Sequence, residues 1–168
     1  MPTRSWDELK RGFTFLETLV VISIILFMLG LLAGVYLNGI RRARISAAVA
    51  LIGKLTIGLE RYEGNLRAYP PGTDVDEGTL YRYLGASITD QRTGKSFRSV
   101  TDFSSDELVE YSDPLWNKSL RVVDPWGNAV FYTADRAVQK HNKSGVEISS
   151  AGPNGIFNDD DDIDNWSK

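Results

Sequence analysis

Residues 13–37 read FTFLETLVVISIILFMLGLLAGVYL, an apolar run in which Glu17 is the one acidic residue. As an α-helix, 25 residues extend about 37 Å, enough to cross a hydrocarbon layer of about 30 Å with some tilt. A secretory signal has a shorter apolar core followed by a small-residue cleavage site, whereas this run continues to Arg41 without such a site. The run therefore predicts a membrane-spanning helix. Because a carboxylate in hydrocarbon costs about 2.5–3.5 kcal/mol, we expect Glu17 to have a partner.

The charges on either side of the run do not fix its orientation. Three basic residues precede the run and three follow it, the latter in RRAR at 41–44. The positive charge is therefore equal at the two ends and does not indicate which end lies in the cytoplasm. A basic run directly after an apolar helix contacts lipid headgroups more often than nucleic acid. We therefore expect contact with the membrane and none with nucleic acid.

The composition argues against an enzyme. The 168 residues carry a net charge of −3, contain no cysteine, and include a single histidine, His141, in a polar stretch. Disulfides and thiolate metal sites are therefore excluded. The chain also has no set of nucleophile, histidine and acid, no phosphate-binding glycine loop, and no H-E-x-x-H metal motif.

After Arg44 the apolar residues become periodic. They recur at intervals of three and four, which places them on one stripe of a helix: Val49, Ile52, Leu55, Leu59, Tyr62 and Leu66. The sequence thus predicts one long helix from about Phe13 to about Leu66, with its outer half packed on a domain. AYPPG at 68–72 ends it, because two prolines and a glycine enforce a turn.

The rest of the chain predicts a small α+β domain. Residues 76–86 predict a short helix presenting Leu80, Tyr83 and Leu84, and residues 87–103 a loop. SSDELVEY at 104–111 predicts a second helix start, because a serine N-cap precedes acidic residues. Three β-rich runs predict short antiparallel strands against the long helix: SLRVV (119–123), AVFYT (129–133) and VEISS (145–149), with a hairpin turn at DPWGN (124–128) between the first two.

The acidic stretch NDDDDIDN at 158–165 holds five aspartates in the six positions 159–164. Their mutual repulsion leaves two interpretations open: the stretch is a solvated acidic tail, or it binds a cation. Oxygen ligands without cysteine favour Ca²⁺ over a transition metal. The spacing is not that of an EF-hand, which needs D-x-D-x-D-G and a glutamate at its twelfth position.

KRGFTFLE at 10–17 resembles the cleavage and methylation motif of type IV pilins and type II secretion pseudopilins. The resemblance implies that a membrane peptidase cuts between Gly12 and Phe13 and that the new amine of Phe13 is N-methylated. It also implies that Glu17 pairs with the Phe13 amine of a neighbouring subunit during assembly, and that the leader lies in the cytoplasm. The chain departs from many members of the family in carrying Gly34 where they have proline.

DPWGN and SAGPNGIFNDDDDIDNW resemble the corresponding stretches of the major pseudopilins of type II secretion systems, whose terminal loop holds calcium. Asn154 stands where the family usually has aspartate, and Asn158 stands where it has glycine. The resemblance implies that Ile163 and Trp166 hold the loop on the core. Carried over by position, the resemblance implies that the side chains of Asn154 and Asp161 bind Ca²⁺. It also implies that the backbone carbonyls of Ala151 and Asn165, together with Ser167, complete the shell of oxygen ligands.

The resemblance covers residues 10–66 and 124–166, whereas 85–120 matches no pattern that we can place. It implies a type IV pilin-like α+β fold with a leader at 1–12, a membrane or filament-core helix at 13–37, and a periplasmic domain at 38–168. The implied function is a structural subunit of the type II secretion pseudopilus. This subunit would be anchored in the inner membrane and processed by the prepilin peptidase. It would assemble with its own copies, with minor pseudopilins and with the inner-membrane platform. The alternative is a type IV pilin, or a minor pilin or pseudopilin, of a surface appendage.

Overall fold

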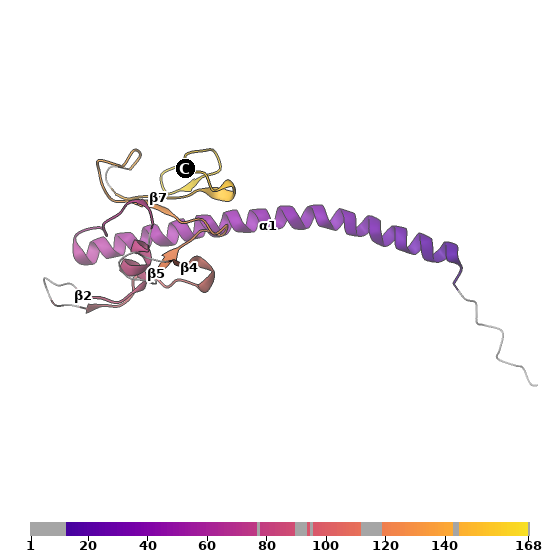
Figure 1. The fold of residues 1–168 in the computed structure, drawn as a ribbon, viewed down its shortest axis with the longest axis horizontal. Helices are drawn as coiled ribbons and strands as arrows, with labels where there is room; N and C mark the ends of the chain where they lie inside the picture. The colour runs from indigo at the N-terminus through magenta and orange to yellow at the C-terminus, as the bar shows by residue number, and fades with distance from the viewer. Residues whose placement is uncertain are drawn as a thin grey trace, which may run out of the picture. The chain divides into compact units, whose positions relative to one another are not determined.

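The computed structural model describes residues 13–76, 78–89, 94, 96–111, 119–142 and 145–167. The predicted leader and Gly12 lie outside these residues. The chain divides into two compact units, Met1–Arg41 and Arg42–Lys168, which are described separately below. Helix α1 (Phe15–Leu66) contributes to both units (Figure 1), so the prediction of one long helix is confirmed.

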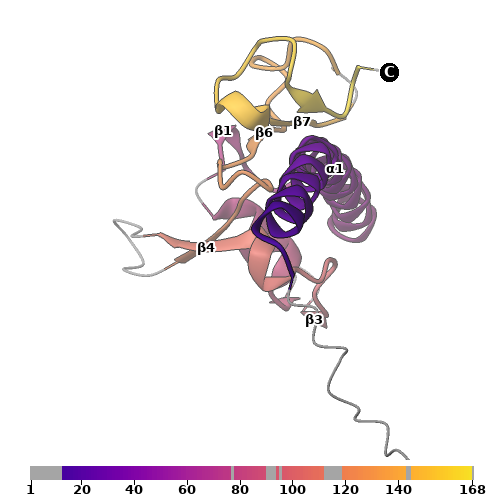
Figure 2. The same cartoon turned by 90° about the vertical axis from the view of Figure 1, so that its right-hand side faces the viewer.

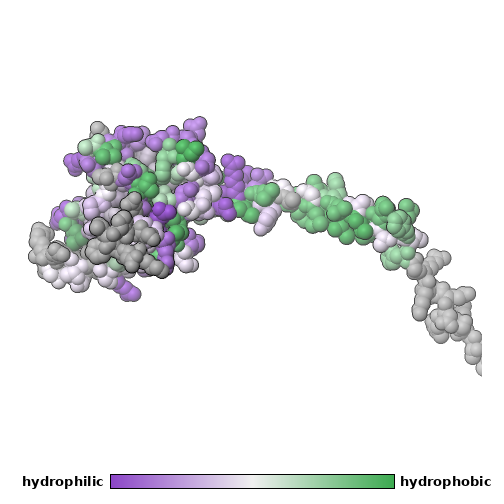
Figure 3. All heavy atoms as spheres, viewed as in Figure 1, coloured by the Kyte–Doolittle hydropathy of each residue, from purple (hydrophilic) through white to green (hydrophobic). Residues whose placement is uncertain are grey.

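The first half of α1 exposes nearly all of its apolar side chains. Figure 3 shows one face of this segment, and the surface of that face is largely apolar. Its large side chains, such as Phe27 and Leu32, are exposed in the isolated chain. Soluble monomers rarely expose so much contiguous apolar surface. The helix is also long and apolar enough to cross a membrane, as expected of a membrane anchor.

The C-terminal end of α1 follows from its sequence. Arg67 adopts a left-handed conformation, with φ of 62°, and its amide donates to the Glu63 carbonyl at 2.7 Å. This is a common helix cap. Pro70 and Pro71 follow and do not continue the helix.

The outer half of α1 packs on the domain through the predicted stripe, with one exception. Ile52, Leu55, Leu59 and Tyr62 are buried, and they join Leu80, Leu84, Val130, Tyr132 and Ile148 in one core. Val49 is 56% exposed, so its assignment to the stripe was wrong. The buried stripe instead continues from Ile52 back by four residues to Ala48, which is fully buried.

The main sheet has four short antiparallel strands in the order β1-β6-β7-β8. Tyr132 of β6 pairs with Asp74 of β1 and with Ile148 of β7. The terminal loop, which we define as residues 151–167 and which includes β8, lies beside these strands (Figure 2). The bounds of the strands are Thr73–Val75 (β1), Phe131–Thr133 (β6), Glu147–Ser150 (β7) and Ile163–Asp164 (β8).

The three predicted strands exist as β5 (Ser119–Val122), β6 and β7, but they do not form one sheet. Strand β5 pairs with β4 (Leu108–Tyr111) in a separate two-stranded sheet. Across the predicted turn, only the bridge between Val123 and Ala129 links the two segments within the described residues. In both views the β4–β5 sheet lies apart from the terminal loop (Figures 1 and 2).

Three further expectations for the middle of the domain are corrected. The predicted helix at 104–111 is one 3-10 turn, η2 (Ser105–Glu107), followed directly by β4, because pairing with β5 overrides the helix-start signal. The predicted loop at 87–103 contains a small hairpin of β2 (Ile88–Thr89) and β3 (Ser96–Phe97). The predicted short helix is a π-type turn, η1 (Tyr81–Gly85), which buries Leu84.

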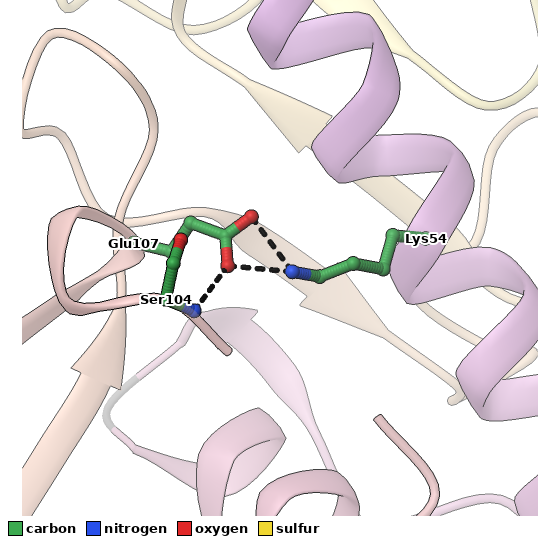
Figure 4. A network of polar contacts seen from close by, with 3 residues as sticks. All are labelled: Lys54, Ser104 and Glu107. Atoms are coloured by element: carbon green, nitrogen blue, oxygen red, sulfur yellow. Dashed lines mark hydrogen bonds and ion pairs between the residues drawn. The ribbon is translucent and has the colours of Figure 1, made fainter. Parts of the chain in front are cut away.

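An ion pair joins α1 to η2, the turn directly before β4 (Figure 4). Lys54 Nζ donates to Glu107 Oε1 at 2.7 Å and to Oε2 at 2.5 Å, while the Ser104 amide donates to the same Oε2 at 2.8 Å. Partial burial tends to raise the pKa of Glu107, but the bonds from Lys54 and Ser104 outweigh it and hold this pKa below 4.5. The pair therefore stabilises the fold above pH 4.5, and this contribution is lost as the pH falls through the lowered pKa.

We expect Glu107→Gln to destabilise the domain by about 1 kcal/mol at pH 7, because both side chains are partly exposed to solvent. Glutamine can still accept the bond from Ser104, so the change removes mainly the charge. Thermal melts of Glu107→Gln, Lys54→Met and the double variant give the coupling free energy at each pH. The coupling should be largest near pH 7 and approach zero at low pH. A coupling independent of pH would contradict the assignment.

Candidate functional site

The predicted assembly residues lie at the N-terminal end of α1. Phe13 is 81% exposed. Glu17 Oε2 accepts hydrogen bonds from the Thr14 amide at 2.8 Å and the Thr14 hydroxyl at 2.9 Å. The Glu17 amide in turn donates to Thr14 Oγ1 at 3.3 Å. This reciprocal arrangement is a capping box, which gives hydrogen-bond acceptors to backbone amides of the first turn that would otherwise be unpaired.

Sequence reasoning missed this second role of Glu17, although the signal was present. T-x-x-E before an apolar run is the signature of a capping box, and residues 14–17 read TFLE. The capping bonds supply donors but no positive charge. Within the described part of the chain, Glu17 forms no ion pair.

The terminal loop brings two of the predicted calcium ligands together. Asn154 ends the short turn η3 (Gly152–Asn154). Its amide nitrogen donates to Asp161 Oδ1 at 2.8 Å and to Asp159 Oδ2 at 2.6 Å. The Asn154 amide thus lies between two carboxylates. Asp159 was not among the predicted ligands.

The electrostatics of the two carboxyl groups, those of Asp159 and Asp161, favour a bound cation. A hydrogen bond between the two carboxyl groups raises the pKa of Asp161 and lowers that of Asp159, because the two share one proton more easily than both ionise. Carboxylate and amide oxygens are the ligands that Ca²⁺ prefers. Asn154, Asp159 and Asp161 therefore fit a calcium site by chemistry, provided that the Asn154 amide rotates to present its oxygen.

The other predicted ligands make different contacts. The Asn165 side chain accepts from the Ile148 amide at 3.1 Å and donates to the Val146 carbonyl at 3.0 Å. The Ser167 hydroxyl donates to Asp164 Oδ1 at 2.6 Å, and Ala151 is fully buried. Among the described residues, no group of three or more acidic, histidine or cysteine side chains has metal-site geometry. Calcium therefore stays a prediction.

The backbone of the loop requires special conformations. Gly152 has φ of 61°, and a Cβ there would collide with the Asp161 carbonyl oxygen, so only glycine allows this close approach. Asn158 also has a positive φ, 71°, which asparagine tolerates better than most residues do. Ile163 packs against the core as expected, whereas Trp166 stacks on His141 with ring centroids 4.8 Å apart.

A buried carboxylate connects the predicted turn to the terminal loop. Asp124 is 2% exposed and accepts bonds from the amides of Trp126 (3.0 Å) and Asn128 (2.8 Å). It also accepts from the Asn128 side chain (3.3 Å) and the Ser150 hydroxyl (2.6 Å). Asn128 then donates to the Gly152 carbonyl at 3.1 Å. Sequence reasoning found the turn, but not that its aspartate anchors the loop.

Comparison with known proteins gives one relative along nearly the whole chain. No protein-family model matches the sequence. Type II secretion system core protein G of Dickeya chrysanthemi is 28% identical over 163 residues, covering 96% of this chain and 89% of that protein. A crystal structure of the major pseudopilin from the type 2 secretion system of enterohaemorrhagic Escherichia coli is also similar. It has a TM-score of 0.46 and 21% identity, and it covers 77% of this chain and 92% of that chain. Over nearly its whole length the chain is therefore similar in sequence to the type II secretion system core protein G of Dickeya chrysanthemi.

Proposed function

We propose that this chain is a structural subunit of a type II secretion pseudopilus. The observation that carries the proposal is the similarity to core protein G over 96% of the chain, together with one long apolar helix that continues into a small domain. The subunit performs no turnover. It assembles with its own copies, and with minor pseudopilins and the inner-membrane platform, into a filament that drives protein export.

Deletion of the gene in its host tests this proposal against the alternative of a surface pilin. We expect exported proteins to accumulate in the periplasm and to disappear from the growth medium, with surface appendages unchanged. Expression of the chain from a plasmid should restore export. Normal export accompanied by loss of surface pili would contradict the proposal and favour the pilin.

Processing and topology follow from the same proposal. The leader 1–12 stays in the cytoplasm until the prepilin peptidase cuts after Gly12 and methylates the amine of Phe13. Residues 13–37 then anchor the subunit in the inner membrane, and 38–168 lie in the periplasm. The new amine supplies the cation that Glu17 does not find among the described residues.

A calcium ion is part of the proposal for the terminal loop. The side chains of Asn154 and Asp161, with Asp159 beside them, would hold the ion, and oxygens of Ala151, Asn165 and Ser167 would complete its shell. The ion would neutralise the clustered aspartates and tie the loop to β7. Because Asn154 carries no charge, the affinity should be lower than with aspartate at this position.

We expect calcium to raise the melting temperature of the fragment 42–168 by about 5–10 °C at a concentration about 100-fold above its dissociation constant. Asp161→Ala should abolish the shift. Asp160→Ala is the matched control, because Asp160 is an exposed carboxylate of the same loop, and it should retain the shift. Asn154→Asp should melt lower in chelator and show a larger shift with calcium. An identical melt of the unaltered fragment in calcium and in chelator would contradict the site.

A further inference from the structure

A cavity of about 310 Å³ lies on the face of the main sheet that points away from the core. Phe131, Glu147 and Ser149 line it, and in β6 and β7 these residues alternate with the core residues Tyr132 and Ile148. The terminal loop closes one side of the cavity and the segment between β6 and β7 another. Its volume is near the lower end of the roughly 300–1,000 Å³ typical of small-ligand pockets.

Two pairs of aromatic rings line the cavity. Phe131 and Phe157 lie with ring centroids 6.1 Å apart at an interplanar angle of 58°. His141 and Trp166 stack with an interplanar angle of 4°. Each pair joins a ring from the sheet or its connecting segment to a ring from the terminal loop. Such aromatic faces attract cations, and they attract planar cations in particular.

The charges that line the cavity are mainly negative. Asp74, Glu147 and Asp162 line it together with one lysine, Lys140. Glu147 is 3% exposed. Burial tends to raise its pKa, but bonds from the amides of Asn142 and its neighbours lower it overall, so Glu147 is ionised near neutral pH.

Asp162 has one carboxylate oxygen without a partner. Its Oδ2 accepts from the Asn158 amide at 2.6 Å, whereas its Oδ1 is buried and has no hydrogen-bond donor among the described residues. Within the same residues, neither Asp162 nor Glu147 forms an ion pair with lysine or arginine. A buried acceptor without a donor is costly, and a ligand that donates to it removes that cost.

We propose that this pocket binds the guanidinium group of an arginine side chain from another protein chain. A guanidinium is planar, stacks on aromatic rings and donates to carboxylates in a fixed fork, so it matches both the aromatic walls and the carboxylate residues that line the pocket. A divalent cation needs a shell of oxygens, which the aromatic walls do not supply. A neutral group leaves the carboxylates without a counter-charge. The proposal does not rest on the pseudopilus assignment.

The test uses the full-length protein in detergent micelles at constant calcium, with N-acetyl-arginine amide as the probe and N-acetyl-citrulline amide as its uncharged isostere. The indole NH signal of Trp166, assigned with Trp166→Phe, reports binding in ¹H–¹⁵N spectra. We expect arginine amide to bind at least about tenfold more tightly than citrulline amide. Equal affinity of the two probes would overturn the proposal.

Matched variants locate the binding. Asp162→Asn, which retains an acceptor for the Asn158 amide, should weaken arginine amide about tenfold, whereas Asp160→Asn removes a charge outside the pocket and should have no effect. Phe157→Leu should weaken binding several-fold, and Ile156→Ala, at an exposed neighbour, should not. Equal effects of Asp160→Asn and Asp162→Asn, or of Ile156→Ala and Phe157→Leu, would show nonspecific attraction and overturn the proposal.

The source of the arginine is identified by crosslinking. The chain contains no cysteine, so Lys140→Cys at the pocket and Ala43→Cys, which keeps the three arginines of the exposed basic run at 41–44, give specific crosslinks when the two variants are expressed together in membranes. A crosslink between them identifies a second copy of this chain as the source. Binding of arginine amide without that crosslink shows that the arginine does not come from the basic run of a second copy.

Discussion

Glu17→Ala is expected to leave leader removal intact and to abolish filament assembly. In the proposed filament, the Glu17 carboxylate neutralises the Phe13 amine of a neighbouring subunit. Breaking a buried charge pair by removing one partner costs about 3–5 kcal/mol. A loss of this size at each subunit contact lowers the assembly constant at least about a hundredfold. Mass spectrometry of the membrane-bound protein reports processing, and chemical crosslinking in membranes reports assembly.

Two further variants separate this charge pair from the capping box. Glu17→Gln retains an oxygen that can accept from Thr14, so the helix start stays capped while the charge is lost, and assembly should still fail. Thr14→Ala removes the cap at a cost of about 1 kcal/mol but keeps the charge, so assembly should persist. The opposite result, with Glu17→Gln assembling and Thr14→Ala failing, would assign Glu17 to the cap alone.

Asp124→Ala is expected to destabilise the domain by about 3–5 kcal/mol, because four hydrogen-bond donors at a buried site lose their acceptor. For a domain of this size the melting temperature should fall by about 10 °C or more. Thermal melts of the fragment 42–168, followed by near-ultraviolet circular dichroism, measure this change.

Two control variants, Ser150→Ala and Asp135→Ala, should destabilise the domain less than Asp124→Ala does. Ser150→Ala removes one of the four donors and should cost about 1 kcal/mol. Asp135 also accepts a backbone bond in a turn, from Ala137 at 2.8 Å, but it is exposed, so Asp135→Ala should cost less than about 1 kcal/mol. If Asp124→Ala costs no more than Asp135→Ala, Asp124 does not anchor the loop.

The long helix could be predicted because its signals are local. A continuous apolar run, a three-to-four periodicity and a double proline fix its presence and its C-terminal end. The partners of the strands could not be predicted in this way. SLRVV predicts a strand equally well beside β6 or beside β4, and only packing of the whole domain selects β4. Strand β8 has two residues within an acidic stretch, and it exists because Ser149 and Ser150 offer an edge for pairing.

The terminal loop was partly predictable for a different reason. The family resemblance placed Asn154 and Asp161 in one site, and the structure brings them within hydrogen-bond distance. Asp159 or Asp160 was expected to add charge to the site, but Asp159 could not be singled out because adjacent aspartates are indistinguishable by composition. The anchoring by Asp124 was missed because residues 124 and 150 meet only after β6 and β7 have paired.

The separation of β4 and β5 from the main sheet has an evolutionary consequence. The β2–β3 and β4–β5 hairpins each set their register internally, and a single bridge joins the described part of the second hairpin to the strand segment that leads into β6. Residues inserted into or deleted from these hairpins therefore change their length without shifting the pairing of β1, β6, β7 and β8. The segment whose sequence we could not place is thus the one that can diverge between lineages while the helix, the main sheet and the terminal loop keep their geometry.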